Sequence, residues 1–509
     1  MPTIIPEQKL IIFDEKDWLG GLHPQGGEIR ALFKPGYDIM DGINPFKSYG
    51  SVTVGEEPSA VTNVALIDGV IKNIVPNTLS VLSSIELWGV GGTKVYSISP
   101  LTGEVEHTSP APHAVASSVM EDVVIYNVSG VEKLLYSYNT ASKGDIGMYD
   151  LASTWDDNYW DTTLTMLPLE KGNPHPMLVG DDDILYIGDG NIVKSIDGST
   201  PEGNESALDL PVGFVIRSFS KLSNNTLVIF ADQNTGNETG KAQAFFWDYS
   251  SPSFYAVYDL DGTTVGGAKE YLGSVAVITK GLSTDLEEGD RDLHLLFFNG
   301  SRFESLGTIE AGAVPTTGGI EVNGNYLIFN SSGKIYSFGT PFYGINAGLM
   351  NIQDLGGALS GAVVRSHKDR IIASSGSSSS YQLELLTGGG SGKGTFYTTH
   401  AEPVNTLLSQ SRIKAVRVEF LTAIGSATSR RLDLLLINEM GLEIKVFKNL
   451  DEILTAKRYK IFQHKSFAST GFRNFQSLQL YACWHGGSSG AAPIIRRVLV
   501  EYEHVDLNK

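Results

Sequence analysis

The sequence predicts an all-β protein, in which a β-propeller of about seven blades lies between an irregular N-terminal arm and a C-terminal β-sandwich. Three observations predict this fold. Glycine makes up 56 of the 509 residues, well above the usual share of roughly 7%, and glycine-rich turns separate short apolar runs. Hardly any window keeps the apolar spacing of a helix; the stretch from Leu450 to Tyr459 is the exception. The third observation is a weak internal repeat.

Residues 1–60 are expected to form the arm. Residues 14–60 contain many Gly and Pro residues (GLHPQGG, FKPG, INPFKSYG) and show little periodicity, which is typical of an extended segment. The first 20 residues carry acidic side chains where a signal peptide would carry basic ones. Together with a single cysteine, Cys483, this predicts synthesis in a reducing cytoplasm.

The repeat predicts the propeller over residues 61–386. Four-residue apolar runs recur at separations of 38, 61, 43, 48, 51 and 45 residues. A short loop and a second, alternating strand follow each run, which is the pattern of a propeller blade with an apolar inner strand. The count favours seven blades and leaves six or eight open. The runs begin at Ile85, Val123, Ile184, Leu227, Val275, Tyr326 and Ile371.

The longest separation predicts an insertion in the second blade, over residues 140–172. This segment contains TWDDNYWD, with Trp155 and Trp160. We expect the two indole rings to pack the insertion back onto the propeller. A ligand platform made by the same rings is the alternative.

The sequence TGGGSGKG at residues 387–394 predicts a flexible linker. Beyond it, residues 395–509 contain longer segments with clean alternation, such as IKAVRVEF and RRVLVEYE. Such alternation places one apolar and one charged face on each strand, as in a sheet that is packed on one side. We therefore expect a β-sandwich of seven or eight strands in this region.

The charge is unevenly distributed. The chain has 38 basic and 57 acidic residues, a formal net charge of −19. Residues 395–509 have 15 basic and 10 acidic residues, net +5, which leaves net −24 in residues 1–394. This acidity disfavours tight binding of nucleic-acid phosphates. The sandwich could dock on an acidic neighbour through its basic residues, or these could be ordinary solvated side chains; they are Arg412, Lys414, Arg417, Arg430, Arg431, Arg496 and Arg497.

No motif assigns a catalytic, cofactor-binding or metal-binding residue, so the sequence predicts no enzyme and no cofactor. LTGGGSGKGT departs from a phosphate-binding loop at Thr387 and Gly394. GGSSG, with Ser488, precedes a predicted strand, whereas a nucleophile elbow precedes a helix. Two acidic clusters, Asp181–Asp183 with Asp189 and residues 285–292, resemble solubilising hairpin tips, and calcium binding stays open for both. No apolar run approaches 18 residues, so we expect no membrane-spanning segment.

The order of these parts is similar to a known family. An irregular arm (NPFKSYGSVTVGEEPSAVTNVALIDGVIK) precedes blades of the type ELWGVGGTKVYSISPLTGEVEH, and GTFYTTHAEPVNTLLSQSRIKAVRVEF opens the sandwich. This arrangement resembles the β-propeller tail proteins of tailed bacteriophages, in particular the nozzle or tail hub of short-tailed phages. The resemblance is one of architecture and includes no diagnostic motif, so it implies no site residues.

The resemblance implies a virion protein, made in the host cytoplasm, that assembles as a ring of six copies. Its implied partners are the portal and adaptor proteins and tail fibres or spikes. DNA would pass through the ring without sequence-specific binding, because an acidic wall repels phosphates. Two alternatives remain: a polysaccharide-degrading propeller enzyme, with an axial funnel lined by carboxylates and aromatic rings, and a receptor-binding protein for host adhesion.

Overall fold

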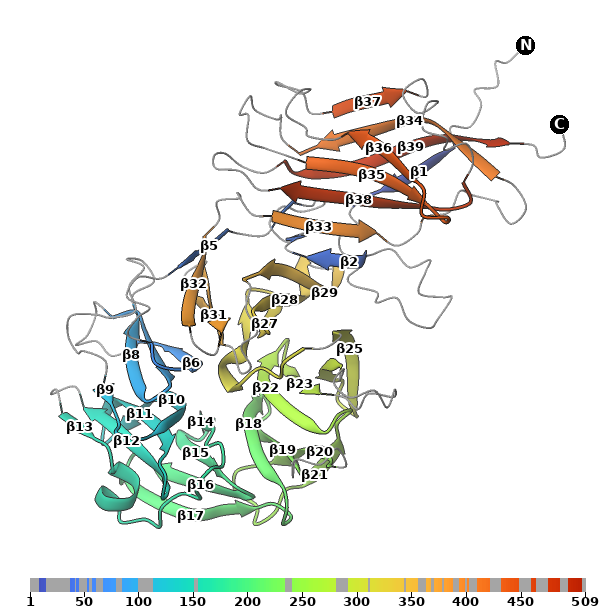
Figure 1. Cartoon of the computed structure of the whole chain (residues 1–509). Coiled ribbons are helices and arrows are strands. Elements are labelled where there is room, and N and C mark those ends of the chain that lie inside the picture. Colours follow the sequence, from blue (N-terminus) through green and yellow to red (C-terminus); the bar gives the residue numbers. More distant parts are fainter. Residues whose placement is uncertain are drawn as a thin grey trace. The chain divides into compact units, whose positions relative to one another are not determined.

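The structure is a computed structural model of the whole chain (Figure 1). It describes residues 9–14, 37–41, 43–44, 53–54, 57–60, 67–78, 85–98, 113–150, 154–233, 240–280, 292–309, 312–342, 345–355, 363–367, 370–377, 380–387, 393–398, 401, 410–421, 432–447, 459–463, 475–485 and 493–505.

The chain divides into two compact units. The propeller unit comprises Pro58–Ile335 and Leu355–Leu386, and the sandwich unit comprises Met1–Glu57, Tyr336–Asp354 and Thr387–Lys509. Both units are built almost entirely of antiparallel strands. No helix among the described residues is long and apolar enough to span a membrane.

Seven four-stranded sheets form the blades, numbered here in chain order (Figure 1). Blades 1 to 3 are β6 (Ile71–Pro76), β7 (Leu87–Gly91), β8 (Lys94–Ile98), β9 (His113–Ala114); β10 (Val119–Val128), β11 (Val131–Asn139), β12 (Gly144–Asp150), β13 (Thr154–Asp156); and β14 (Met177–Val179), β15 (Ile184–Asp189), β16 (Ile192–Asp197), β17 (Glu202–Asp209). Blades 4 and 5 are β18 (Val215–Leu222), β19 (Thr226–Asp232), β20 (Ala242–Trp247), β21 (Ala256–Asp259); and β22 (Thr264–Tyr271), β23 (Ser274–Lys280), β24 (Leu293–Phe298), β25 (Phe303–Ile309). Blades 6 and 7 are β26 (Ile320–Asn323), β27 (Tyr326–Ser331), β28 (Lys334–Phe342), β29 (Ile345–Asp354); and β30 (Val364–His367), β31 (Arg370–Ser377), β32 (Ser380–Thr387), β5 (Glu57–Ala60).

The last blade takes its outer strand from the start of the chain. Strand β5 pairs beside β32, although more than 300 residues separate the two in sequence. Residues 57–60, which were expected in the arm, are therefore part of a blade. This pairing closes the propeller, because it gives blade 7 four strands, the number that the other blades have.

The apolar runs of the repeat are not the inner strands that we expected. In six blades they form the second strand, and the strand that follows is the third. A strand in the middle of a blade is covered on both faces by neighbouring blades, so it reads as a continuous apolar run. Strand β19, for example, is buried at every position.

The second blade breaks the pattern, and this corrects the predicted insertion. Its apolar run at Val123 lies in the first strand, β10, and the second strand contains Leu134 instead. With Leu134 as the reference, the separations of 38 and 61 become 49 and 50 residues. Strands β12 and β13 occupy part of the segment predicted as an insertion. The true excursion lies between β13 and β14 and contains one π-helical turn, η4 (Tyr159–Thr163).

The propeller core is divided into layers between adjacent blades. One cluster joins blades 1 and 2 around Trp88 and Tyr136, and another joins blades 2 and 3 around Trp160. Similar clusters join blades 3 and 4, blades 4 and 5, and blades 7 and 1. Because the apolar surface lies between the sheets, each blade is stabilised mainly by its neighbours.

The sandwich unit contains a four-stranded and a five-stranded sheet of its own, in the orders β1-β39-β34-β37 and β2-β33-β38-β35-β36. It also includes most of β28 and all of β29, the two outer strands of blade 6. Seven described strands follow the predicted linker, where seven or eight were expected, and β1 and β2 come from the predicted arm. A separate hairpin is formed by β3 (Ile43–Asn44) and β4 (Thr53–Val54). The sandwich strands are β1 (Leu10–Phe13), β2 (Tyr37–Asp41), β33 (Lys393–Thr398), β34 (Gln410–Phe420), β35 (Leu432–Asn438), β36 (Glu443–Phe447), β37 (Tyr459–Gln463), β38 (Leu478–His485) and β39 (Ile495–Val505).

The N-terminal region thus contributes strands to both units, where the sequence predicted an irregular arm. Strand β1 pairs with β39 and strand β2 with β33, both antiparallel. Side chains Ile11 and Phe13 alternate into the core. The predicted linker is also shorter than expected, because Thr387 ends β32 and Lys393 begins β33.

Candidate functional site

The first strands of all seven blades surround a cavity of about 270 Å³ on the propeller axis. Its lining is mixed, with aliphatic side chains between charged ones. Of the described residues that line this cavity, Phe219 is the only aromatic one. The charged lining residues are Lys221, Lys269, Glu270, Glu321 and Arg365.

A second cavity, of about 200 Å³, lies where these first strands begin. Strands β6, β10, β18 and β22 each contain a β-bulge close to their start. A bulge re-aims the extra residue. The residues at the four bulges, Lys72, Glu121, Arg217 and Gly266, all line this second cavity.

The charged side chains at the axis form ion pairs that join blades. Lys72 Nζ of blade 1 lies 2.7 Å from Glu121 Oε2 of blade 2. Glu321 of blade 6 binds both Lys269 of blade 5, at 3.2 Å, and Arg365 of blade 7. Partly buried pairs of this kind fix geometry more than they add stability.

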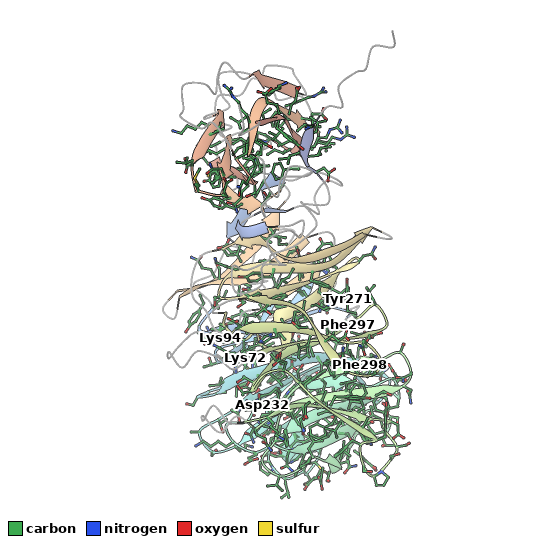
Figure 2. The ribbon with its side chains drawn as sticks, turned by 90° about the vertical axis from the view of Figure 1, so that its right-hand side faces the viewer. Lys72, Lys94, Asp232, Tyr271, Phe297 and Phe298 are labelled. Carbon is green, nitrogen blue, oxygen red and sulfur yellow. The ribbon has the colours of Figure 1, made fainter. Side chains whose placement is uncertain are left out.

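Asp232 connects blade 4 to blade 5. Its Oδ1 accepts a hydrogen bond from Arg217 Nε at 3.0 Å, within blade 4. Its Oδ2 accepts one from the backbone N–H of Val265, in blade 5, at 2.9 Å. Figure 2 labels Asp232, and also Lys72 of blade 1. Charged groups near the axis therefore connect neighbouring sheets through ion pairs and hydrogen bonds.

A fully buried carboxylate, that of Asp122, connects three blades through hydrogen bonds. Its Oδ1 accepts hydrogen bonds from Asn73 Nδ2 of blade 1 at 2.5 Å and from its neighbour Val123 N at 2.8 Å. Its Oδ2 accepts one from Met177 N of blade 3 at 2.7 Å. Burial raises the pKa of Asp122 to about 6, although these three donors act in the opposite direction.

The two tryptophans of the second blade lie where packing, the interpretation favoured from the sequence, would place them. Trp160 is buried between blades 2 and 3, and its Nε1 donates to Leu167 O at 2.8 Å. Trp155 is stacked between two rings, His113 at 4.0 Å and Tyr149 at 4.2 Å. Neither ring is arranged as an open platform.

The first acidic cluster makes contacts within blade 3 and with blade 4. Asp181 Oδ1 lies 2.8 Å from Lys221 Nζ, and Asp182 accepts a hydrogen bond from the Tyr186 hydroxyl at 2.6 Å. Asp189 lies 3.0 Å from Lys194 Nζ. The second cluster falls outside the described residues except for residue 292. Within the described part of the chain, no group of three or more His, Cys, Asp or Glu side chains could hold a metal ion.

Sequence reasoning missed one cluster, on the sandwich. Cys483 and His485 share one face of β38, with Sγ and Nδ1 3.9 Å apart, and His485 Nε2 lies 2.8 Å from Asp433 Oδ2 of β35. The sequence of contacts, from thiol to imidazole to carboxylate, is that of a catalytic cysteine triad. A nucleophilic cysteine, however, needs a lowered pKa. Burial instead raises the pKa of the Cys483 thiol. The spacing of residues 483 and 485 could have indicated the shared face, but not the partner in β35.

The remaining candidates from the sequence lie in strands, in ion pairs of the sandwich or outside the described residues. Thr387 and Gly394 lie in strands β32 and β33, not at the start of a helix. Ser488 falls outside the described residues, as do Arg430 and Arg431. Several basic side chains of the sandwich pair within their own sheet: Lys414 with Glu503 at 3.2 Å, Arg417 with Glu419 at 2.8 Å, and Arg497 with Glu419 at 2.5 Å.

No protein-family model matches the sequence, and no curated protein matches it either. Several solved propeller structures are similar to the chain. Hydrazine synthase of Kuenenia stuttgartiensis has 13% identity and a TM-score of 0.43, over 61% of this chain and 97% of that one. The WD40 domain of Neurospora crassa Pan2 has 10% identity and a TM-score of 0.42, over 62% and 89%. Virginiamycin B lyase of Staphylococcus aureus has 12% identity and a TM-score of 0.40, over 65% and 98%.

These similarities concern the fold alone, because the identities are too low to transfer an activity. The all-β propeller predicted from the sequence is confirmed.

Proposed function

We propose that the protein is a structural component of a bacteriophage tail, which assembles as a ring-shaped nozzle or hub and conducts DNA. The observation that carries the proposal is the separation of charge between the two units. The propeller unit holds 17 basic and 37 acidic residues, net −20, and the sandwich unit holds 21 and 20, net +1. An acidic propeller that faces the lumen of a ring would repel the phosphates of passing DNA.

DNA would pass through the lumen of the ring rather than along the axis of one propeller. The axial cavities, of about 270 and 200 Å³, are far too small for a duplex. Several of their charged side chains are paired across blades, as in the pair of Lys269 and Glu321. In this proposal each propeller is a rigid building block, and portal, adaptor and tail fibre proteins are its neighbours.

Mass photometry and electron microscopy of the full chain test the proposal. We expect a closed ring of about six copies whose lumen carries the acidic surface of the propeller units. A ring with a lumen lined by Lys and Arg would overturn the proposal, and so would a monomer that neither assembles alone nor binds phage portal and adaptor proteins. A monomer that cleaves or binds glycans would support the alternatives, a polysaccharide-degrading enzyme or a receptor-binding protein.

A further inference from the structure

Among the described residues, the four-stranded sheet of the sandwich has two edges without a strand partner, at β1 and at β37. An exposed edge strand offers unpaired N–H and C=O groups to another chain, and proteins usually protect such edges with charges, Pro or short strands. The nature of each edge therefore indicates whether it is built to stay free or to pair.

Strand β1 is the exception among the edges. Its sequence is LIIF, with no charge and no Pro. All other edge strands of four or more residues in the described structure contain at least one charged residue. In the sandwich, for example, β36 reads EIKVF and β2 reads YDIMD. The edge of β1 thus lacks the charged residue that the other described edge strands of this length carry.

The side chains of β1 divide their roles by face. Ile11 and Phe13 are buried in the sandwich and hold the strand in register with β39. Ile12 points to the other face and is 44% exposed. The strand is therefore firmly attached to β39 on one side, while its other side is apolar and has no strand partner in the described part of the chain.

We propose that the free edge of β1 pairs with the free edge of β37 in a second copy of this chain, so that one sheet continues from copy to copy around a ring. The inference rests on the ring assembly proposed above. A ring needs a heterologous contact between two different surfaces, and β1 and β37 are opposite ends of the same sheet. Their lengths, four and five residues, are similar.

The charges of the neighbouring sequence are complementary. Residues 7–17 contain four acidic and two basic residues, and residues 457–465 contain four basic residues and no acidic one. Opposite charges that flank an antiparallel or parallel pair favour the correct partner over a second copy of the same edge. A contact of β1 with itself would place two acidic segments together.

Disulfide trapping tests the pairing, because the sheet order makes the result unambiguous. Within one copy, β39 and β34 lie between β1 and β37, so the two edges are about 14 Å apart at about 4.8 Å per strand. A disulfide needs Cα atoms within about 7 Å. Any bond between these two strands must therefore join two copies.

In a Cys483→Ser background, Ile12→Cys is combined with a cysteine at each position from 459 to 463 in turn. We expect a covalent ladder of two to about six copies on non-reducing gels for at least one position, and none for Ile12→Cys alone. Dimers from Ile12→Cys alone would show that β1 pairs with itself and would overturn the inference. No ladder at any position, in a preparation that forms rings, would also overturn it and leave the ring itself standing.

A matched pair of lysine substitutions provides an independent readout. Ile12→Lys places a charge on the β1 edge, and Val257→Lys does so on the edge strand β21 of the propeller, where the side chain is similarly exposed, at 39%. We expect Ile12→Lys to abolish rings without changing the thermal unfolding, and Val257→Lys to leave rings intact. Rings that persist with Ile12→Lys would overturn the edge pairing, whereas a wild-type chain that forms no ring would overturn the proposed function.

Discussion

The propeller and the sandwich use the start of the chain in the same way but are held together differently. Strand β5 completes blade 7, and strands β1 and β2 complete the two sheets of the sandwich. In the propeller, buried polar groups such as Asp122 also tie one inner strand to the next. In the sandwich, the added strand β1 is held by apolar burial of Ile11 and Phe13. We therefore expect the two units to respond to different substitutions.

The largest effect should come from Phe13→Ala. The side chain is 0% exposed, and loss of a buried phenyl ring costs about 3–5 kcal/mol. We expect this loss in the unfolding of the sandwich, with the propeller transition unchanged, and calorimetry with separate transitions measures both. Ile12→Ala, on the exposed face of the same strand, is the matched control and should change little. Equal shifts in both transitions would contradict the independence of the two units.

The second effect concerns Asp122 and depends on pH. Burial raises its pKa to about 6 from 3.8 in the unfolded chain, so the folded state binds the proton more tightly. The stability that this carboxyl contributes is fully present below about pH 4 and is lost as the pH rises through 6. At about 1.4 kcal/mol per pKa unit, Asp122→Ala should cost roughly 3 kcal/mol more at pH 4 than at pH 8, in the propeller transition.

Chemical denaturation of wild type and variant at each pH measures this difference. Burial lowers the pKa of His175, which opposes the trend in the wild type but cancels in the comparison. Asp181→Ala is the control, because it removes an ion pair on a partly exposed side chain, worth about 0–1 kcal/mol. A cost of Asp122→Ala that does not change with pH would show that the carboxyl is not the titrating group.

The sequence predicted the middle strands of the blades well, because burial on both faces makes runs such as that of β19 continuously apolar. It did not predict the first strands, because bulges at Lys72 and Glu121 interrupt their alternation. Strand β1 was missed since four residues give no period, and its partner lies far away in sequence: Phe13 pairs with Val498. The contacts between blades at the axis, such as those of Asp122 and Glu321, could not be predicted either, because their partners also lie far away in sequence.

A smaller effect should follow from Glu321→Ala, which removes the shared partner of Lys269 and Arg365 at the axis. Hydrogen bonds to charged groups contribute about 1.5–3 kcal/mol when they are partly buried, so we expect a loss in this range in the propeller transition. Glu304→Ala breaks the exposed pair with Arg302, at 2.8 Å, on the outer strand β25. This control should cost less than about 1 kcal/mol. Equal costs would argue that the axial pairs do not join the blades.

The smallest effect is a gain in stability. Leu272 lies in the turn between β22 and β23 with φ of 50°, next to Gly273 with φ of 75°. A branched side chain in the left-handed region costs roughly 1 kcal/mol, and Asn-Gly is the favoured pair in such a turn. Leu272 is 66% exposed, so Leu272→Asn removes little packing and should raise the stability of the propeller by about 0.5–1 kcal/mol.

Val212→Asn, at a residue that is 91% exposed and has no positive φ, is the control and should be neutral. A loss of stability in Leu272→Asn would mean that the leucine makes contacts in the folded propeller that outweigh the backbone strain.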